Sequence, residues 1–222
     1  MSSLSRSNLF TKSFSTDSDD IKVCWNNFLA IQQNQTAVSS FLWDIIKNSN
    51  GSIFYTDFRH GTNIDRRFYS QIINGTCRPS HETIQMLSKS ECFTEEQREE
   101  LLEFGDTQRA FQIINSIAKT NLGLPSIDNK NTRLELQNDV FISSTEIRKI
   151  ANGARSGFKT VLKLCFGLHC SVLQSVELLA AYGYCWQKDE QSLFLKDELS
   201  LKRYKAIDIL YDWEIYTGKF AA

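Results

Sequence analysis

The chain has few of the residues that interrupt helices, because its 222 residues include only 2 prolines and 10 glycines. Few stretches alternate apolar and polar residues with a period of two, which is the pattern of a half-buried β-strand. The composition is 41% hydrophobic and 12% aromatic, enough to bury one larger core or two smaller ones. These features together predict an all-α fold.

The chain also lacks an excess of charge of either sign. It has 25 Lys and Arg against 26 Asp and Glu, for a net charge of -1. This balance argues against a protein that coats nucleic acid through bulk charge, but it leaves room for a local basic face. No apolar run approaches about 18 residues, so the sequence predicts no membrane span.

Signatures of metal, cofactor and catalytic sites are missing. None of the 6 cysteines forms a Cys-x-x-Cys pair, and the 3 histidines are far apart, so we predict no metal site and no cofactor. With no secretory signal at its start, we expect a cytoplasmic protein with reduced thiols. No phosphate-binding loop, His-Glu-x-x-His or Gly-x-Ser-x-Gly motif occurs, so we expect no enzyme.

Apolar periodicity organises the first part of the chain. Residues 1–19 are Ser-rich and without period, which predicts a flexible tail. Within residues 20–33, Ile21, Cys24, Phe28 and Ile31 share one helical face. A second helix is expected over residues 36–47.

The segment over residues 53–75 predicts a pair of helices joined by a short turn. Phe54 and Phe58 belong to the first helix, and Gly61 and Asn63 tolerate positive φ in the turn. Asp65 is the expected N-cap of the second helix, which ends at Asn74-Gly75. Further N-caps are expected at Ser80 and Thr94.

The same order of caps, core positions and turns occurs again later in the chain. At a shift of 78 residues, Ile142 matches Ile64, Ser143 matches Asp65, and Asn152-Gly153 matches Asn74-Gly75. After one residue is lost in the next turn, Thr160 matches Thr83 and Leu178-Leu179 match Leu101-Leu102 at a shift of 77. The chain therefore contains two copies of one helical unit.

This unit resembles the lambda-repressor/Cro-type (XRE-like) helix-turn-helix domain. The resemblance rests on the motif "IDRRFYSQIINGTCRPSHETI" in the first copy, and it extends over roughly residues 36–104 and 110–183. It implies two tandem five-helix-type bundles with extra terminal helices. We expect a tail over 1–19, a first domain with an added N-terminal helix over 20–107, a second, degenerate domain over 108–185, and a helical extension over 186–222.

The turn of the second copy departs from the family pattern. Asn63 and Phe141 stand where the family usually has a turn glycine, and Arg59 and Gln137 replace a small residue. Asn63 still fits a left-handed turn, whereas a bulky residue in that conformation is strained. We therefore expect the second copy to use a different turn around Phe141.

The family consists mostly of DNA-binding transcriptional regulators, so the resemblance implies binding of double-stranded DNA. In such domains the second helix of the pair enters the major groove, and flanking residues meet phosphates. The candidate DNA-binding residues of the first copy are Tyr55, Arg66, Arg67, Ser70, Gln71, Asn74 and Arg78. Those of the second copy are Arg133, Ser144, Thr145, Arg148, Lys149 and Arg155.

Local charge agrees with this interpretation. Residues 59–78 hold four Arg against Asp65, and residues 145–163 hold five Lys or Arg against Glu146. Solvated helix faces also carry such runs, however, and residues 95–106 form an acidic stretch. The alternative is a protein-binding module on the same scaffold, such as a phage or mobile-element inhibitor of a host system, of the anti-CRISPR type. The helices after Tyr184 are a candidate homodimer or partner surface.

Overall fold

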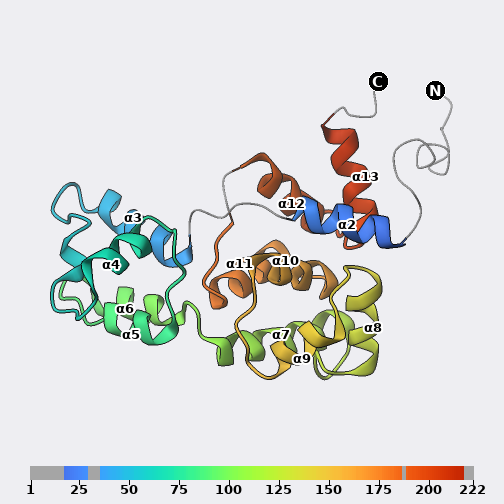
Figure 1. Cartoon of the computed structure of the whole chain (residues 1–222), viewed down its shortest axis with the longest axis horizontal. Coiled ribbons are helices and arrows are strands. Elements are labelled where there is room, and N and C mark those ends of the chain that lie inside the picture. The colour runs from blue at the N-terminus through green and yellow to red at the C-terminus, as the bar shows by residue number, and fades with distance from the viewer. Residues whose placement is uncertain (1–17, 30–35, 187–188, 218–222) are drawn as a thin grey trace.

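A computed structural model describes residues 18–29, 36–186 and 189–217, and it is all-helical (Figure 1). The described residues contain twelve α-helices, one 3-10 helix and no β-strand. The first seven elements are α2 (Ser18–Phe28), α3 (Ala37–Asn48), η1 (Asp57–Arg59), α4 (Arg66–Ile73), α5 (His81–Leu87), α6 (Glu95–Glu103) and α7 (Thr107–Leu122). The others are α8 (Lys130–Asn138), α9 (Ser144–Ala151), α10 (Phe158–Gly167), α11 (Val172–Ala181), α12 (Glu190–Ser200) and α13 (Ala206–Tyr216).

Helices α3 to α6 and η1 surround a small hydrophobic core, and we call this part the first lobe (Figure 1). Leu42, Phe58, Ile72, Ile84 and Leu101 are fully buried in it, one from each element. Each helix thus contributes one apolar face, as the spacing of these residues predicts.

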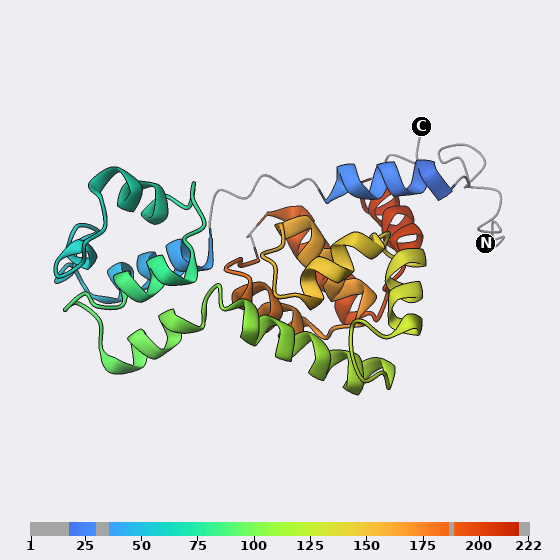
Figure 2. The same cartoon turned by 60° about the horizontal axis from the view of Figure 1, so that its bottom comes forward.

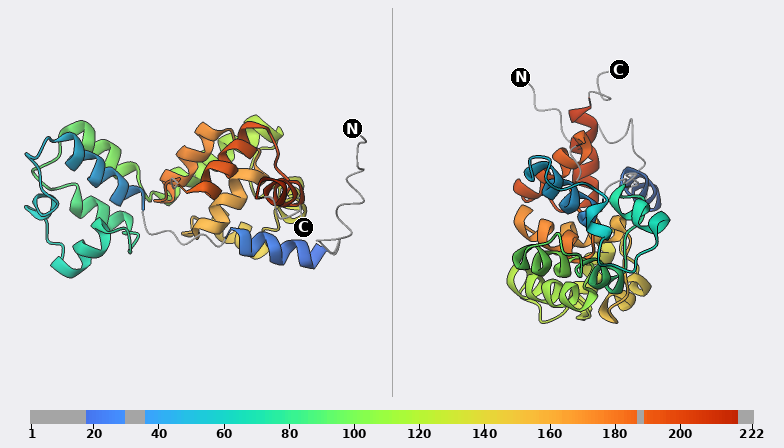
Figure 3. Two further views of the ribbon diagram at one scale, coloured as in Figure 1. Left: turned by 90° about the horizontal axis from the view of Figure 1, so that it is seen from above. Right: turned by 90° about the vertical axis from the view of Figure 1, so that its left-hand side faces the viewer.

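Helices α7 to α13 and α2 surround a larger core, and we call this part the second lobe. Figure 2 and Figure 3 show the two lobes side by side along the long axis of the molecule. In the second core, α10 lies unusually close to α8, because a Cβ on Gly167 would stand only 2.3 Å from Leu136 Cδ2. Any larger residue at this contact would force the side chains of Leu136 and Val140 to shift.

The position of α2 corrects one expectation. The helix was assigned to the first domain, but Trp25 is fully buried in the second core, with its ring 5.9 Å from that of Phe166. Phe28 packs against Trp213 of α13, at 5.3 Å between ring centroids. Periodicity shows which face of a helix is apolar but not which core receives it. The helix also includes Ser18 and Asp19, which we had placed in the tail; residues 1–17 and Ile31 lie outside the described residues.

The four expected N-caps and the two expected Asn-Gly helix stops are confirmed. The side chains of Asp65, Ser80, Thr94 and Ser143 each accept a hydrogen bond from a first-turn amide. The glycines after α4 and α9, Gly75 and Gly153, have φ of 72° and 74°. These local signals are encoded within a few residues, which is why the sequence alone reveals them.

The segment before α4 differs from the expected helix. Only the three residues of η1 are helical there, and Phe54 and Tyr55 are exposed in the preceding turn. The left-handed residue of the following turn is Gly61, with φ of 77°, and not Asn63. In the second copy, which we expected to be degenerate, the equivalent of η1 is α8. This helix has 9 residues, whereas η1 has 3.

The turn between α8 and α9 corrects the expectation for Phe141. This residue does adopt the left-handed conformation, with φ of 56°. Two contacts hold it there: its side chain packs on the second core, and its carbonyl oxygen accepts a hydrogen bond from Lys163 Nζ at 3.0 Å. Tertiary contacts thus offset the local strain of a bulky residue with positive φ.

Candidate nucleic-acid interface

Helix α4 presents a polar face to solvent. Its inner face consists of Tyr69, Ile72 and Ile73, which are buried in the first core. The residues on its outer face, together with the residue that follows the helix, are exposed: Arg66, Arg67, Ser70, Gln71 and Asn74. At its start, backbone amides of Phe68 and Arg67 donate to the Asp65 carboxylate, which lowers the pKa of Asp65. The sole acidic group of this segment is therefore engaged with the backbone.

Helix α9 has the same division between its two faces. Ile147 and Ile150 are buried, whereas Ser144, Thr145, Arg148 and Lys149 are exposed. Gln137 of α8 donates to the Ser144 hydroxyl and so links the two helices across the turn. Each copy thus has a capped eight-residue helix with an exposed basic and polar face.

Two flanking candidates lie in different surroundings. Arg133 of α8 forms an ion pair with Asp128 at 3.0 Å, so its charge is partly balanced. Tyr55 is 53% exposed, and its carbonyl oxygen accepts a hydrogen bond from the Tyr69 hydroxyl of α4. Tyr55 therefore lies beside α4, although it belongs to a turn and not to the helix that the sequence predicts there.

Arg78 has a role that differs from the expected phosphate contact. Its Nη1 atom donates to the carbonyl oxygens of Ser156 at 2.8 Å and Tyr182 at 2.9 Å, both in the second lobe. Its guanidinium also lies over the Tyr184 ring, 4.5 Å from the centroid. Burial at this contact lowers the pKa of Arg78. The side chain thus joins the two lobes.

Arg155 forms the matching contact in the opposite direction. Its Nη2 atom donates to the Pro79 carbonyl oxygen at 2.7 Å. Arg155 matches Arg78 at a shift of 77 residues, and Ser156 matches Pro79 at the same shift. The two contacts are therefore equivalent. Each arginine donates to the other copy, to the carbonyl oxygen of the residue that matches its own next residue in the chain.

The Lys and Arg residues of the two basic segments divide into those that donate to backbone carbonyls and those that do not. Of their nine Lys and Arg, four donate to backbone carbonyls: Arg59, Arg78, Arg155 and Lys163. The other five are Arg66, Arg67, Arg148, Lys149 and Lys159, and none of them forms an ion pair with another described residue. Charge counting alone does not separate these two groups.

Lys163 has a structural role that was not predicted from the sequence, although the sequence carries a signal for it. This lysine is 4% exposed and lies between buried residues on both sides in α10. Burial is the main reason why its pKa is lowered, and the nearby Glu146 carboxylate partly compensates. A lysine inside an otherwise apolar helix is expected to have a specific partner.

Comparisons with known proteins identify no relative of this chain. No protein-family model matches it, and neither a curated protein nor a solved structure does so. Among the described helices, none is both long enough and apolar enough to cross a membrane.

Proposed function

We propose that this protein is a sequence-specific DNA-binding transcriptional regulator that contacts double-stranded DNA through α4 and α9. The observation that supports this proposal most is the equivalent exposure of both helices. Each has a capped N-terminus, a buried apolar face and an outer face with two free cations, Arg66 and Arg67 on α4 and Arg148 and Lys149 on α9.

The residue types on these faces suit the edges of bases. Arginine donates two hydrogen bonds to guanine in the major groove, and Gln71 has the amide that pairs with adenine. Ser70, Ser144 and Thr145 have hydroxyl groups that bind bases or phosphates. If both helices bind one face of a duplex, the two contacted sites lie about one helical turn, roughly 34 Å, or a multiple of it apart.

Salt-dependent binding to a pool of random duplexes, followed by sequencing of the retained DNA, tests the proposal. We expect an enriched sequence and an affinity that falls steeply with salt, by about 0.9 log units per log unit of salt for each phosphate contacted. The paired variants Arg66→Ala/Arg67→Ala and Arg148→Ala/Lys149→Ala should reduce this slope. Lys119→Ala, at an exposed lysine of α7, is the matched control.

A protein-binding role on the same scaffold is the second candidate, and one observation favours it. Phe54 and Tyr55 are 63% and 53% exposed in the turn before η1, and aromatic side chains contribute strongly to protein interfaces. If no duplex is enriched and the folded protein shows no salt-dependent binding, the DNA proposal fails and the protein-binding role becomes the leading candidate.

A further inference from the structure

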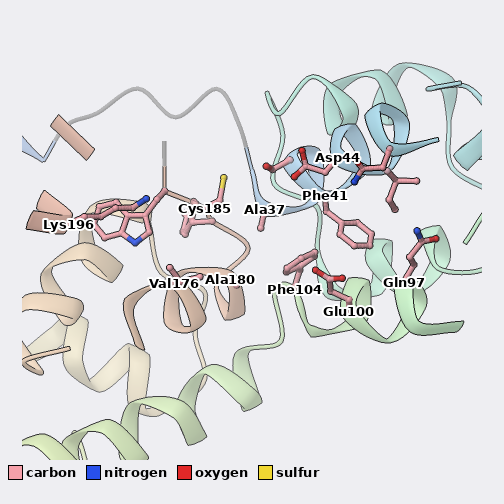
Figure 4. A pocket seen from close by; sticks show the side chains of 15 residues that line it. Ala37, Phe41, Asp44, Gln97, Glu100, Phe104, Val176, Ala180, Cys185 and Lys196 are labelled. Carbon is pink, nitrogen blue, oxygen red and sulfur yellow. The ribbon is translucent and has the colours of Figure 1, made fainter. Parts of the chain in front are cut away.

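A pocket of about 460 Å³ lies between the two lobes, away from the outer faces of α4 and α9. Figure 4 shows its walls, which come from α3 and α6 on one side and from α11, α12 and the segment after α11 on the other. Its volume falls within the range of pockets that bind small molecules, roughly 300–1,000 Å³. Pockets between domains are common places for such ligands.

The wall from the first lobe combines aromatic rings with carboxylates. Phe41 and Phe104 meet edge to face, with ring centroids 5.6 Å apart. The carboxylates of Asp44 and Glu100 lie on either side of this pair (Figure 4). Gln97 adds an amide group, whose oxygen is already bound to the Thr94 backbone amide and whose nitrogen remains as a donor.

The wall from the second lobe has the opposite charge. Lys196 of α12 places its ammonium 5.7 Å from the centroid of the Trp186 ring. Val176 of α11, which is 47% exposed, adds apolar surface beside it. The pocket therefore has an ammonium on one wall, carboxylates on the other, and apolar side chains between them.

These charges do not neutralise one another across the pocket. Within residues 18–29, 36–186 and 189–217, neither Lys196 nor Glu100 forms an ion pair, and Asp44 pairs only with Lys47, at 3.8 Å. Both partners of that pair are about two-thirds exposed, so it contributes little. The two walls are thus available to groups of complementary charge.

We propose that this pocket binds a small zwitterion with an apolar body, of the class of short apolar peptides with free termini. The amino terminus binds one of the carboxylates of the first-lobe wall, Asp44 or Glu100. The carboxyl terminus binds Lys196, and the apolar side chains lie on Phe41, Phe104 and Val176. This inference goes beyond the proposed DNA binding and does not depend on it. It is supported by the arrangement of the pocket, in which apolar side chains separate groups of opposite charge.

Equilibrium dialysis of the full chain tests this inference. The probe is a pool of tripeptides built from Leu, Ile, Val, Met and Phe with free termini, and mass spectrometry identifies the retained members. The matched probe is the same pool with acetylated amino termini and amidated carboxyl termini. We expect saturable retention of free peptides, and about a hundredfold weaker retention of capped ones, as for the loss of two charge-assisted hydrogen bonds of about tenfold each.

Variants locate the binding within the protein. Lys196→Gln and Asp44→Asn/Glu100→Gln should each weaken retention about tenfold, and Val176→Trp should abolish it by filling the pocket. Glu95→Gln, at an exposed position of α6, should bind as the wild type does. Circular dichroism of each variant separates loss of binding from loss of folding.

Two outcomes would overturn the inference. The first is that no free peptide is retained above the level of the capped pool. The second is that folded Lys196→Gln and Val176→Trp proteins retain the peptides as the wild type does, which would place the binding elsewhere.

Discussion

Glu198 is a buried carboxyl group whose surroundings do not favour its charged form. It is 3% exposed, and its Oε2 atom has no hydrogen-bond partner among the described residues. Arg203 lies 3.8 Å from Oε1 but is bound more closely to Asp212. Burial, followed by repulsion from Asp212, raises the pKa of Glu198 to about 7.

The raised pKa predicts how stability depends on pH. Between pH 4.5 and about 7 the folded protein keeps a proton that the unfolded chain releases. The contribution of Glu198 to the free energy of unfolding is thus present below pH 4.5 and is lost as the pH rises to about 7. Glu198→Gln should therefore stabilise the protein at pH 8, on the order of 2–3 kcal/mol, with little effect at pH 4.5.

Urea unfolding of the Glu198→Gln variant at both pH values measures this difference. Asp197→Asn, at the exposed neighbouring position, is the control and should show no comparable gain. An equal gain at pH 4.5 and pH 8 would show that titration of Glu198 is not its cause.

At the scale of elements, the turn between α8 and α9 depends on a residue from α10. Lys163 Nζ donates to the carbonyl oxygen of Phe141, whose φ of 56° is strained. The first copy has Met86 at the position equivalent to Lys163 and has Gly61 in its turn. In the first copy Gly61 supplies the positive φ of the turn, and the equivalent of Phe141, Asn63, does not have positive φ.

The substitution Lys163→Met gives the second copy the methionine that the first copy has at the equivalent position, Met86. It should lower the free energy of unfolding by about 1–3 kcal/mol, because the Phe141 carbonyl loses its partner. The expected structural effect is faster hydrogen exchange of the first-turn amides of α9. Lys159→Met, on the same helix but half-exposed, serves as the control. If Lys163→Met leaves the free energy of unfolding unchanged, Lys163 does not anchor this turn.

If α4 and α9 both contact bases, each should determine a separate part of the DNA sequence. Arg67→Ala should reduce affinity for the enriched duplex by about 1–3 kcal/mol and relax the preference at one position. Arg148→Ala should do the same at a second position about ten base pairs, or a multiple, away. Sequencing the duplexes retained by each variant tests this, and a preference unchanged by either substitution would exclude base contacts from that helix.

The sequence predicts the elements better than their assembly. Asp65, Ser80, Thr94 and Ser143 mark the starts of their helices because a cap acts on amides two or three residues away. By contrast, the helical start expected around Phe54 is reduced to η1, and Phe141 adopts a conformation that its own propensity disfavours. The conformation of Phe141 depends on contacts distant in sequence, which its local propensity does not reflect.

The same division holds for the candidate site. The spacing of the apolar residues within α4 and within α9 identifies the exposed cations of each helix, because a helix with one buried face has a defined outer face. It does not distinguish Arg66 from Arg78, which lie in one basic segment. Arg78 follows the helix, and the second lobe alone decides that its guanidinium meets two carbonyl oxygens.

At the scale of the whole molecule, the contact between the lobes is reciprocal. Arg78 binds the Ser156 carbonyl and Arg155 binds the Pro79 carbonyl, and these four residues match in pairs at a shift of 77. The turns after α6 and after α11 also meet here, since a Cβ on Gly183 would lie 3.9 Å from the Cα of Gly105. In a symmetric dimer, equivalent residues exchange contacts in this way.

This contact predicts that the first lobe depends on the second for stability. The first lobe has about 70 residues, a size at which a single core is marginal. The second lobe has the larger core, with eight helices around it. Arg78→Ala/Arg155→Ala should therefore accelerate hydrogen exchange of the α5 amides at least about tenfold and leave that of the α10 amides nearly unchanged.

Arg66→Ala/Arg148→Ala is the matched control, because it removes two exposed arginines at no contact between the lobes. Arg78→Lys retains the charge but loses the planar guanidinium, so its effect should be intermediate. Equal acceleration in α5 and α10 of the Arg78→Ala/Arg155→Ala protein would mean that both cores unfold as one unit regardless of this contact. Unchanged exchange in α5 would mean that the first lobe is stable by itself, and that the paired arginines fix only the orientation of α4 relative to α9.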